Sequence, residues 1–280
     1  MPSGKPTNHS FTLTNHSDDF DSRDEAGWHD GSRVYGGNGD DSIRTEGDHN
    51  LVSGGNGQDV LVVCGDCNTV DGGNGKDDLR VIGDDNRVYG GNGVDCLVAT
   101  GVGNLLDGGN GADRLVSTSR GGFGEVGEGN VLTGGHGPDT FVLSNRSDLR
   151  VINDGGGDHH PGLPPAPGTG VVSQGDIIVG VMDEITDYTA GERLRINAQH
   201  EASDPIGLDG ILPGQQHLEL ADGEYAFIRG DQIGNGRFAV DDQGGDLLLV
   251  YDASGGGDAH VLQGAVVLQG VTDADSVFVC

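Results

Sequence analysis

Single apolar residues recur nine positions apart between residues 34 and 143, and glycine and polar residues fill most positions between them. An amphipathic helix needs apolar residues every three or four positions, so this spacing argues against helices. Nine residues suit a turn of about six followed by a strand of about three, and only the middle strand residue then faces inward, because side chains alternate across a strand. The pattern predicts stacked short strands joined by turns.

Two nine-residue units alternate in this region. The first has Gly-Gly at its start, glycine fourth, aspartate sixth and an apolar residue eighth, and it begins at positions 36, 54, 72, 90, 108 and 134. The second has glycine third, an apolar residue eighth and asparagine sixth, at Asn50, Asn68, Asn86, Asn104 and Asn130. Two units make one 18-residue coil. Coils of this kind stack at the spacing of paired strands, roughly 4.8 Å.

Composition supports a repeat and indicates a cationic partner. The 280 residues include 54 glycines, and only 34% are apolar and 5% aromatic, which is too little for an ordinary core. An acid-rich chain of this kind also fits disorder, but the regular period favours a repeat fold. The net charge of -30 argues against nucleic acid and anionic membranes as partners and in favour of cations.

The unit Gly-Gly-x-Gly-x-Asp-x-apolar-x closely resembles the calcium-binding nonapeptide of RTX (haemolysin-type) proteins. The resemblance implies an all-β fold, a right-handed parallel β-roll built as a solenoid of 18-residue coils over residues 34–143. An N-terminal cap or arm (1–33) precedes the roll. A β-rich C-terminal cap and secretion region (144–280) follows it, with a Gly/Pro-rich loop at 155–170.

The turns of the first unit are the predicted calcium sites. Calcium takes six to eight oxygen ligands, and glycines let a turn aim its carbonyl oxygens at one point. In the family, each ion lies between consecutive turns and the sixth-position aspartates of both contribute, so about four or five ions are expected here. Eight extra residues within 117–129 leave open whether the last site forms. The predicted metal-binding residues are Gly36, Asn38, Asp41, Gly54, Gly55, Asn56, Gly57, Asp59, Gly72, Gly73, Asn74, Gly75, Asp77, Gly90, Gly91, Asn92, Gly93, Asp95, Gly108, Gly109, Asn110, Gly111, Asp113, Gly135, Gly137 and Asp139.

The asparagine turns are expected to be free of calcium, because stacked asparagines can bond one another and the turn backbone. The small apolar core is also expected to be too weak to order so glycine-rich a backbone alone. The chain without calcium is therefore predicted to be largely unfolded.

The C-terminal half contains strand-like runs such as "GDIIVGVMDEI" and "DLLLVYD", which predict the β-rich cap. The segments "DTFVL" and "DEITDYTAGERLRI" resemble those that close RTX arrays in type I-secreted proteins. The ending "DADSVFVC" is similar to the region that the type I exporter reads, although it also fits a final strand. The start lacks a basic stretch followed by an apolar one, and no stretch is long enough to span a membrane. A secreted, extracellular protein is expected, with the exporter as a partner.

The sequence predicts no enzyme. It has no zinc-protease helix, nucleophile elbow or phosphate loop, and Trp28 is expected to cover the first coil. The cysteines of "CGDC" (64–67) are interpreted as turn residues, with a local disulfide as the alternative, and "DHH" (158–160) as loop residues. An alternative function is that of an extracellular polysaccharide-binding or enzyme-associated module, similar to the repeat modules of alginate epimerases. The negative charge and the few aromatic residues disfavour it.

Overall fold

The computed structural model describes residues 9–24, 30–119, 125–146, 149–153, 170–172, 177–196, 200–201, 207–209, 216–220, 223–252 and 263–280. These residues form strands and two short 3₁₀ helices. Nowhere in these ranges is there a helix of the length and apolarity that crossing a membrane requires. The chain folds into two compact units, residues 1–116 with 132–141, and residues 117–131 with 142–280.

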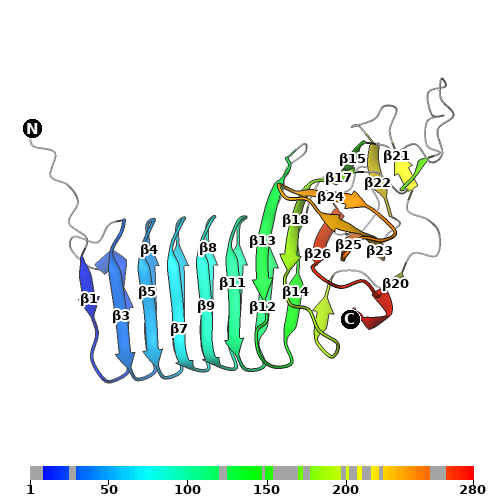
Figure 1. Cartoon of the computed structure of the whole chain (residues 1–280). Helices are drawn as coiled ribbons and strands as arrows, with labels where there is room; N and C mark the ends of the chain where they lie inside the picture. Colours follow the sequence, from blue (N-terminus) through cyan, green and yellow to red (C-terminus); the bar gives the residue numbers. More distant parts are fainter. Residues whose placement is uncertain are drawn as a thin grey trace, which may run out of the picture. The chain divides into compact units, whose positions relative to one another are not determined.

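Two ladders of parallel strands build the first unit, here called the roll (Figure 1). One ladder contains β1 (Ser10–Thr12), β3 (Arg33–Asn38), β5 (Leu51–Asn56), β7 (Thr69–Gly75), β9 (Arg87–Gly93) and β11 (Leu105–Asn110). The other contains β2 (Asp19–Asp21), β4 (Ser42–Glu46), β6 (Val60–Cys64), β8 (Asp78–Ile82), β10 (Cys96–Thr100), β12 (Arg114–Thr118) and β14 (Thr140–Leu143). The helix η1 (Ser22–Asp24) follows β2, and β12, β13 (Gly127–Thr133) and β14 each span the boundary between the two units.

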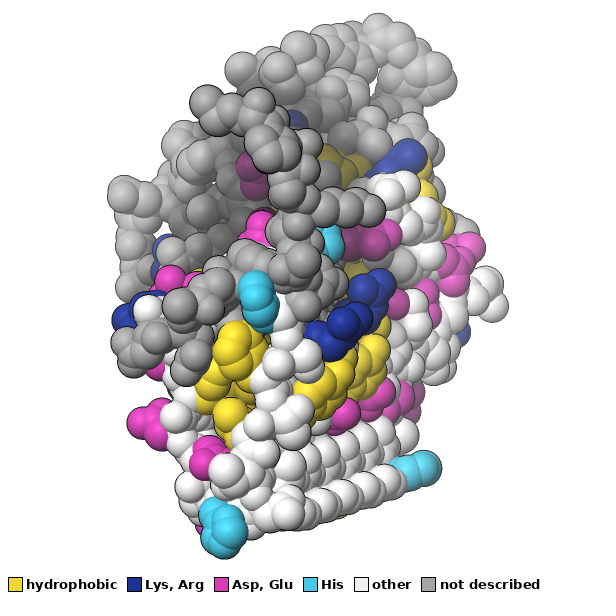
Figure 2. All heavy atoms as spheres, turned by 90° about the vertical axis from the view of Figure 1, so that its left-hand side faces the viewer, with side chains coloured by type: hydrophobic (Ala, Val, Ile, Leu, Met, Phe, Trp, Pro, Cys, Tyr) yellow, Lys and Arg dark blue, Asp and Glu magenta, His cyan; other side chains and the backbone are white. Residues whose placement is uncertain are grey.

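The register of both ladders repeats the sequence period. Val52 pairs with Val70 and Val70 with Val88 in one ladder, and Leu61 pairs with Leu79 in the other. These apolar residues are buried between the ladders, as are the other eighth-position residues. In Figure 2 the end of the roll that holds β1 faces the viewer, and side chains of one kind recur in rows, as stacked equivalent positions require. The predicted all-β roll of parallel coils is confirmed.

Two details of the roll differ from the sequence prediction. The strands of the second ladder are five residues long in β4, β6, β8 and β10, and each buries two residues in place of one. The second buried position holds Thr45, Val63, Val81 or Ala99. The ladders also begin before residue 34, because β1 pairs with β3 and β2 pairs with β4.

The turns require glycine because the backbones of adjacent coils approach each other closely there. A Cβ added to Gly93 would lie 1.4 Å from the Gly75 carbonyl oxygen, and the φ of Gly93 is +148°. Both the space and the backbone angle exclude a side chain there, because an L-residue is strained at such an angle.

We expect Gly93→Ala to destabilise the roll by more than about 4 kcal/mol, because the stacked backbones must separate to admit the methyl group. The measurement is urea unfolding in calcium. Gly127→Ala is the control, since an added Cβ there meets nothing within 4 Å. Equal losses of stability in the two variants would contradict the argument from stacking.

The second unit is β-rich, as predicted, and its strands are mainly antiparallel. The strand β25 pairs with β23 and β26, and β24 pairs with β17. Apolar residues of these strands, among them Phe238, Leu248 and Val267, form its core. Its strands and helix are β15 (Arg150–Asn153), β16 (Gly170–Val171), β17 (Ile177–Val179), β18 (Val181–Ile185), β19 (Arg193–Arg195), β20 (His200–Glu201), β21 (Gly207–Asp209), β22 (Gln216–Glu219), β23 (Glu224–Gln232), β24 (Arg237–Val240), β25 (Asp246–Asp252), β26 (Gln263–Leu268) and η2 (Ala274–Ser276). Trp28, the histidines at 159–160 and residues 155–169 of the Gly/Pro-rich loop lie outside the described residues.

Candidate metal centre

The sixth-position aspartates form a continuous ladder through the roll. One carboxylate oxygen, Oδ1, of each aspartate accepts a hydrogen bond from the backbone amide of the aspartate in the preceding turn. The Asp59 Oδ1 accepts from the Asp41 amide at 2.8 Å, and the Asp77 Oδ1 accepts from the Asp59 amide at 2.8 Å. The same bond joins Asp77 to Asp95 and Asp95 to Asp113. The ladder fixes every carboxylate in the same orientation.

The second carboxylate oxygen, Oδ2, is buried without a hydrogen-bond partner. Among the described residues this holds for Asp41, Asp59, Asp77, Asp95 and Asp113. A buried polar atom that lacks a partner costs roughly 1–3 kcal/mol, and more when the group is charged. A regular row of such atoms is therefore suited to binding a cation.

The carbonyl oxygen of the next turn lies beside each of these carboxylates. A Cβ added to Gly54 would lie 2.3 Å from the Asp59 Oδ2 and 2.8 Å from the Gly72 carbonyl oxygen, so both oxygens border the space that the glycine leaves open. We call this pair of oxygens, an aspartate Oδ2 and the first-glycine carbonyl of the following turn, an inter-turn site. Both atoms are acceptors, so no hydrogen bond can join them directly, whereas a cation could bind both.

The described residues of the roll contain five inter-turn sites of this geometry. They are found at Gly36, Gly54, Gly72, Gly90 and Gly108, where the same two kinds of oxygen lie 2.3–2.8 Å from an added Cβ. The last of them includes the Gly134 carbonyl, which the sequence prediction left out although Gly134 begins the sixth Gly-Gly pair. The Asp113 amide donates to the Asp139 Oδ1 at 2.8 Å, so the ladder continues across the insertion.

Burial raises the pKa of these carboxyl groups. The pKa of Asp59, Asp77, Asp95 and Asp113 is raised to about 6, first by burial and further by the charge of the neighbouring aspartates, while the backbone hydrogen bond lowers it. The pKa of Asp41 is also raised, mainly by burial. A cation in the inter-turn sites would oppose this rise, because it stabilises the ionised form.

The opposite side of the roll has the same ladder with asparagine in place of aspartate. The Asn68 Oδ1 accepts from the Asn50 amide at 2.8 Å, and the Asn86 Oδ1 accepts from the Asn68 amide at 2.8 Å. The asparagine Nδ2 is a donor, and in Asn104 it donates to the Gly83 carbonyl oxygen at 3.0 Å. Bonding of stacked asparagines to the turn backbone was predicted and is confirmed. Asparagine carries both a donor and an acceptor, so these side chains can pair without a charge, and among them the Asn68 Nδ2 is buried without a hydrogen-bond partner.

In the second unit, an aspartate, Asp183, accepts the kind of backbone hydrogen bond that an asparagine accepts in the roll. The Asn130 amide donates to the Asp183 Oδ1 at 2.8 Å, and the Ser117 hydroxyl donates to the Asp183 Oδ2 at 2.7 Å. Burial raises the pKa of Asp183 to about 6. The sequence prediction missed this residue because "VMDEI" has neither glycine nor asparagine to mark it.

The third-position asparagines do not join the inter-turn sites through their side chains. The Asn56 Nδ2 donates to the Asn38 Oδ1 at 2.7 Å, and the same amide ladder continues to Asn110 on the exposed side of the turns. Their backbone carbonyls also serve the strand ladder, since the Gly57 amide donates to the Asn74 carbonyl oxygen at 2.9 Å. The sequence predicts these asparagines as metal-binding residues, and the ladder shows only that their side-chain amides bond one another on the exposed side of the turns.

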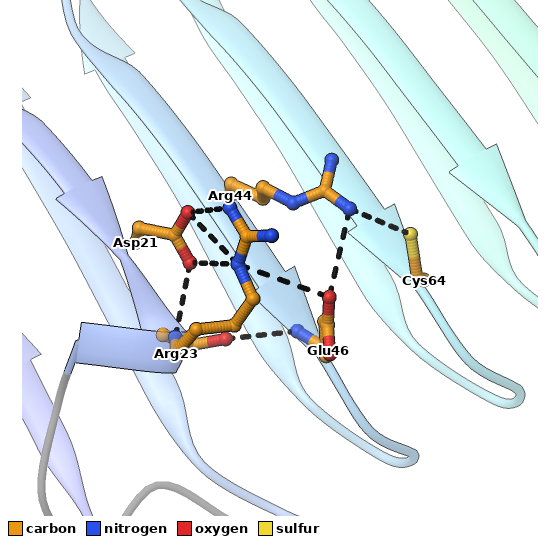
Figure 3. Close-up of polar contacts among 6 residues, drawn as sticks. Asp21, Arg23, Arg44, Glu46 and Cys64 are labelled. Atoms are coloured by element: carbon orange, nitrogen blue, oxygen red, sulfur yellow. Dashed lines mark hydrogen bonds and ion pairs between the residues drawn. The ribbon is translucent and has the colours of Figure 1, made fainter.

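Other polar groups do not form a comparable site. Within the described ranges, no group of three or more His, Cys, Asp or Glu side chains is placed to hold a metal ion, because each inter-turn site has a single carboxylate oxygen and otherwise backbone. Figure 3 shows a surface network in which Arg23 binds Asp21 and Arg44 contacts Glu46 at 3.5 Å. Arginine already neutralises these carboxylates, whereas the turn aspartates have no such partner in the described network.

The cysteines of "CGDC" take no part in the inter-turn sites. All four cysteines are free, so the local disulfide is absent. The Arg44 guanidinium lies 4.0 Å from the Cys64 Sγ on the roll surface (Figure 3). Cys67 is an exposed turn residue with a φ of +58°. The interpretation of both as turn or strand-end residues stands.

Comparisons with known proteins add no family to this description. No family model matches the chain, and no curated protein matches it.

Proposed function

We propose that the chain is a calcium-binding protein of the RTX type, whose roll folds when calcium enters the inter-turn sites. The observation that carries the proposal is the row of buried Oδ2 atoms, each without a hydrogen-bond partner and each beside a carbonyl oxygen of the next turn. Asp41, Asp59, Asp77, Asp95 and Asp113 would hold the ions together with the first glycine carbonyls of the turns at 54, 72, 90, 108 and 134.

Calcium fits this donor set better than other common cations. It prefers carboxylate and carbonyl oxygens and tolerates irregular coordination, whereas magnesium needs a near-ideal octahedron and keeps its water. Zinc and copper favour nitrogen and sulfur ligands, which the inter-turn sites lack. The two oxygens of an inter-turn site come from two stacked turns, so an ion bound to both would stabilise the contact between coils.

The setting that suits such sites is a calcium-rich one outside the cell. Extracellular calcium modules bind in the range of about 10⁻⁴–10⁻³ M, which lets a chain stay unfolded where calcium is scarce and fold where it is abundant. Export through a type I exporter, followed by folding outside, is part of this proposal, and the resemblance of the C-terminal segments to those of exported RTX proteins supports it.

A calcium titration of the metal-free chain by calorimetry at pH 7 tests the proposal. We expect about five bound ions, one for each inter-turn site, with heat changes that include folding of the roll. Magnesium at the same concentrations is the control and is expected to bind weakly. Absence of calcium binding at millimolar concentration would overturn the proposal.

A further inference from the structure

Residues 13–18 form an additional turn at the start of the roll that the sequence pattern does not reveal. Leu13 to Asp18 reads LTNHSD, which lacks the glycines of the repeat but keeps the third asparagine and the sixth aspartate. The pairing of β2 with β4 aligns Phe20 with Ile43, and Phe20 is buried like the other eighth-position residues.

Three side-chain ladders of the roll extend to this turn. The Asp18 amide donates to the Asp41 Oδ1 at 2.8 Å, as each aspartate amide does to the next turn. The Asn38 Nδ2 donates to the Asn15 Oδ1 at 2.9 Å. The Asp40 amide donates to the Ser17 Oγ at 3.1 Å, and the equivalent Gln58 amide donates to the Asp40 Oδ1 at 2.7 Å. Residues 13–18 therefore make the same kinds of hydrogen bond as a repeat turn.

The Oδ2 atom of this turn's carboxylate has hydrogen-bond donors from its own turn. The Asp18 Oδ2 accepts from the Thr14 amide at 2.7 Å and from the Thr14 hydroxyl at 2.8 Å. In the inter-turn sites, the equivalent Oδ2 of Asp41 or Asp59 is buried without a hydrogen-bond partner. Thr14 thus donates hydrogen bonds to an Oδ2 atom that has no donor in the inter-turn sites.

The backbone of this turn is also unsuited to a cation. Gly37 and Gly39 have φ values of +104° and +117°, but Thr14 and His16, at the same positions, are not among the residues with positive φ. Leu13 stands at the first position, where an added Cβ in the repeats would lie within 2.8 Å of the aspartate Oδ2. A side chain therefore begins where the repeats leave space for an ion.

We infer that residues 13–18 are a metal-independent starting turn, in which Thr14 replaces the cation and the Asp18 amide positions Asp41 for the first inter-turn site. The inference rests on the proposed function, since it assigns Thr14 and Asp18 as positioning residues for the first calcium ion. It also predicts that this turn itself binds no ion, although it carries an aspartate in the ladder.

The test compares Thr14→Val with Thr12→Val, a matched change two residues earlier in β1. Calcium is titrated into each ¹⁵N-labelled full chain, and the amide resonances of Gly37 and Gly39 report the first site while those of Gly91 and Gly93 report an interior one. We expect Thr14→Val to weaken calcium binding at the first site by about three- to tenfold and to leave the interior site unchanged. Equal affinities at the first site in the two variants would overturn the inference.

A gain-of-site variant tests the same inference in the other direction. Leu13→Gly, Thr14→Gly and His16→Gly together restore the repeat glycines around Asp18, so calorimetry should count one more calcium ion than in the wild type. An unchanged count would contradict the cation-replacing role of Thr14. If the wild type itself bound no calcium, the proposed function would fail; if it bound calcium but Thr14→Val changed nothing, only this inference would fail.

Discussion

Removing calcium is expected to unfold the roll, and far-ultraviolet circular dichroism should show loss of its β-sheet signal. Without a cation, each inter-turn site places a buried carboxylate oxygen beside a carbonyl oxygen. An ion at a hundred times its dissociation constant stabilises the folded state by about 2.7 kcal/mol, so five ions contribute more than about 10 kcal/mol, as much as the whole stability of a typical domain. Magnesium should not restore the spectrum. A β-rich spectrum that is the same with and without calcium would contradict this expectation.

The pH dependence of the metal-free chain gives an internal control. The pKa of Asp59, Asp77, Asp95 and Asp113 lies at about 6 in the folded roll, above the ordinary value of 3.8. A raised pKa means that the protonated groups stabilise the folded roll below pH 3.8 and that this stabilisation is lost as the pH rises through about 6. Metal-free protein should therefore regain β-sheet signal as the pH falls from 7 to 5, and calcium should matter less there. A metal-free roll that loses signal over this range would count against the burial of these carboxyl groups.

Replacing Asp77 should remove bound calcium, whereas replacing Asn86 should not. The two residues are a matched pair, because the Oδ1 of each accepts from the backbone amide of the preceding coil, at 2.8 Å in both cases. Ala at either position therefore loses this hydrogen bond, worth about 1–3 kcal/mol, and Asn86→Ala also loses the bond from the Asn86 Nδ2 to the Asn104 Oδ1 at 3.0 Å. Only Asp77→Ala also loses the Oδ2 of an inter-turn site and loosens the contact between adjacent coils.

Calorimetric titration with calcium compares the two variants. The ion count should fall by at least one in Asp77→Ala and stay unchanged in Asn86→Ala. If Asn86→Ala lost as many ions as Asp77→Ala, the assignment of calcium to one side of the roll would be wrong. Asp77→Asn refines the result, because it keeps an Oδ1 acceptor and replaces only the Oδ2 by a donor.

The period of the sequence predicted the roll because stacking repeats every constraint. Along the ladder a residue such as Val70 pairs only with its equivalents Val52 and Val88. The residues that suit one coil therefore also suit the next. Glycines that need positive φ and close approach, such as Gly93, recur for the same reason. The aspartate positions of the candidate sites were visible in the same way.

The starting turn and the second unit lacked such a period. Thr14 and Asp18 belong to a turn without glycine, and five extra residues between Asp21 and Asp30 lengthen the spacing from Asp18 to the next ladder aspartate from 18 to 23 residues. Asp183 lies far along the chain from Asn130, whose amide it binds. Contacts of this kind join residues that no repeat relates, so the pattern of one coil could not predict them.

The sequence alone was enough to predict the all-β coil of 18 residues, the eighth-position apolar residues that face inward and the side of the roll that carries aspartate. The folded structure was needed to show which oxygen of each aspartate accepts from the neighbouring amide, which oxygen has no hydrogen-bond partner, and where the ladder starts. The physical reason is that a repeat specifies which residues become neighbours, whereas the partner of each polar atom depends on the register of the adjacent coil. At the starting turn, the partner of the aspartate Oδ2 is a threonine of the same turn.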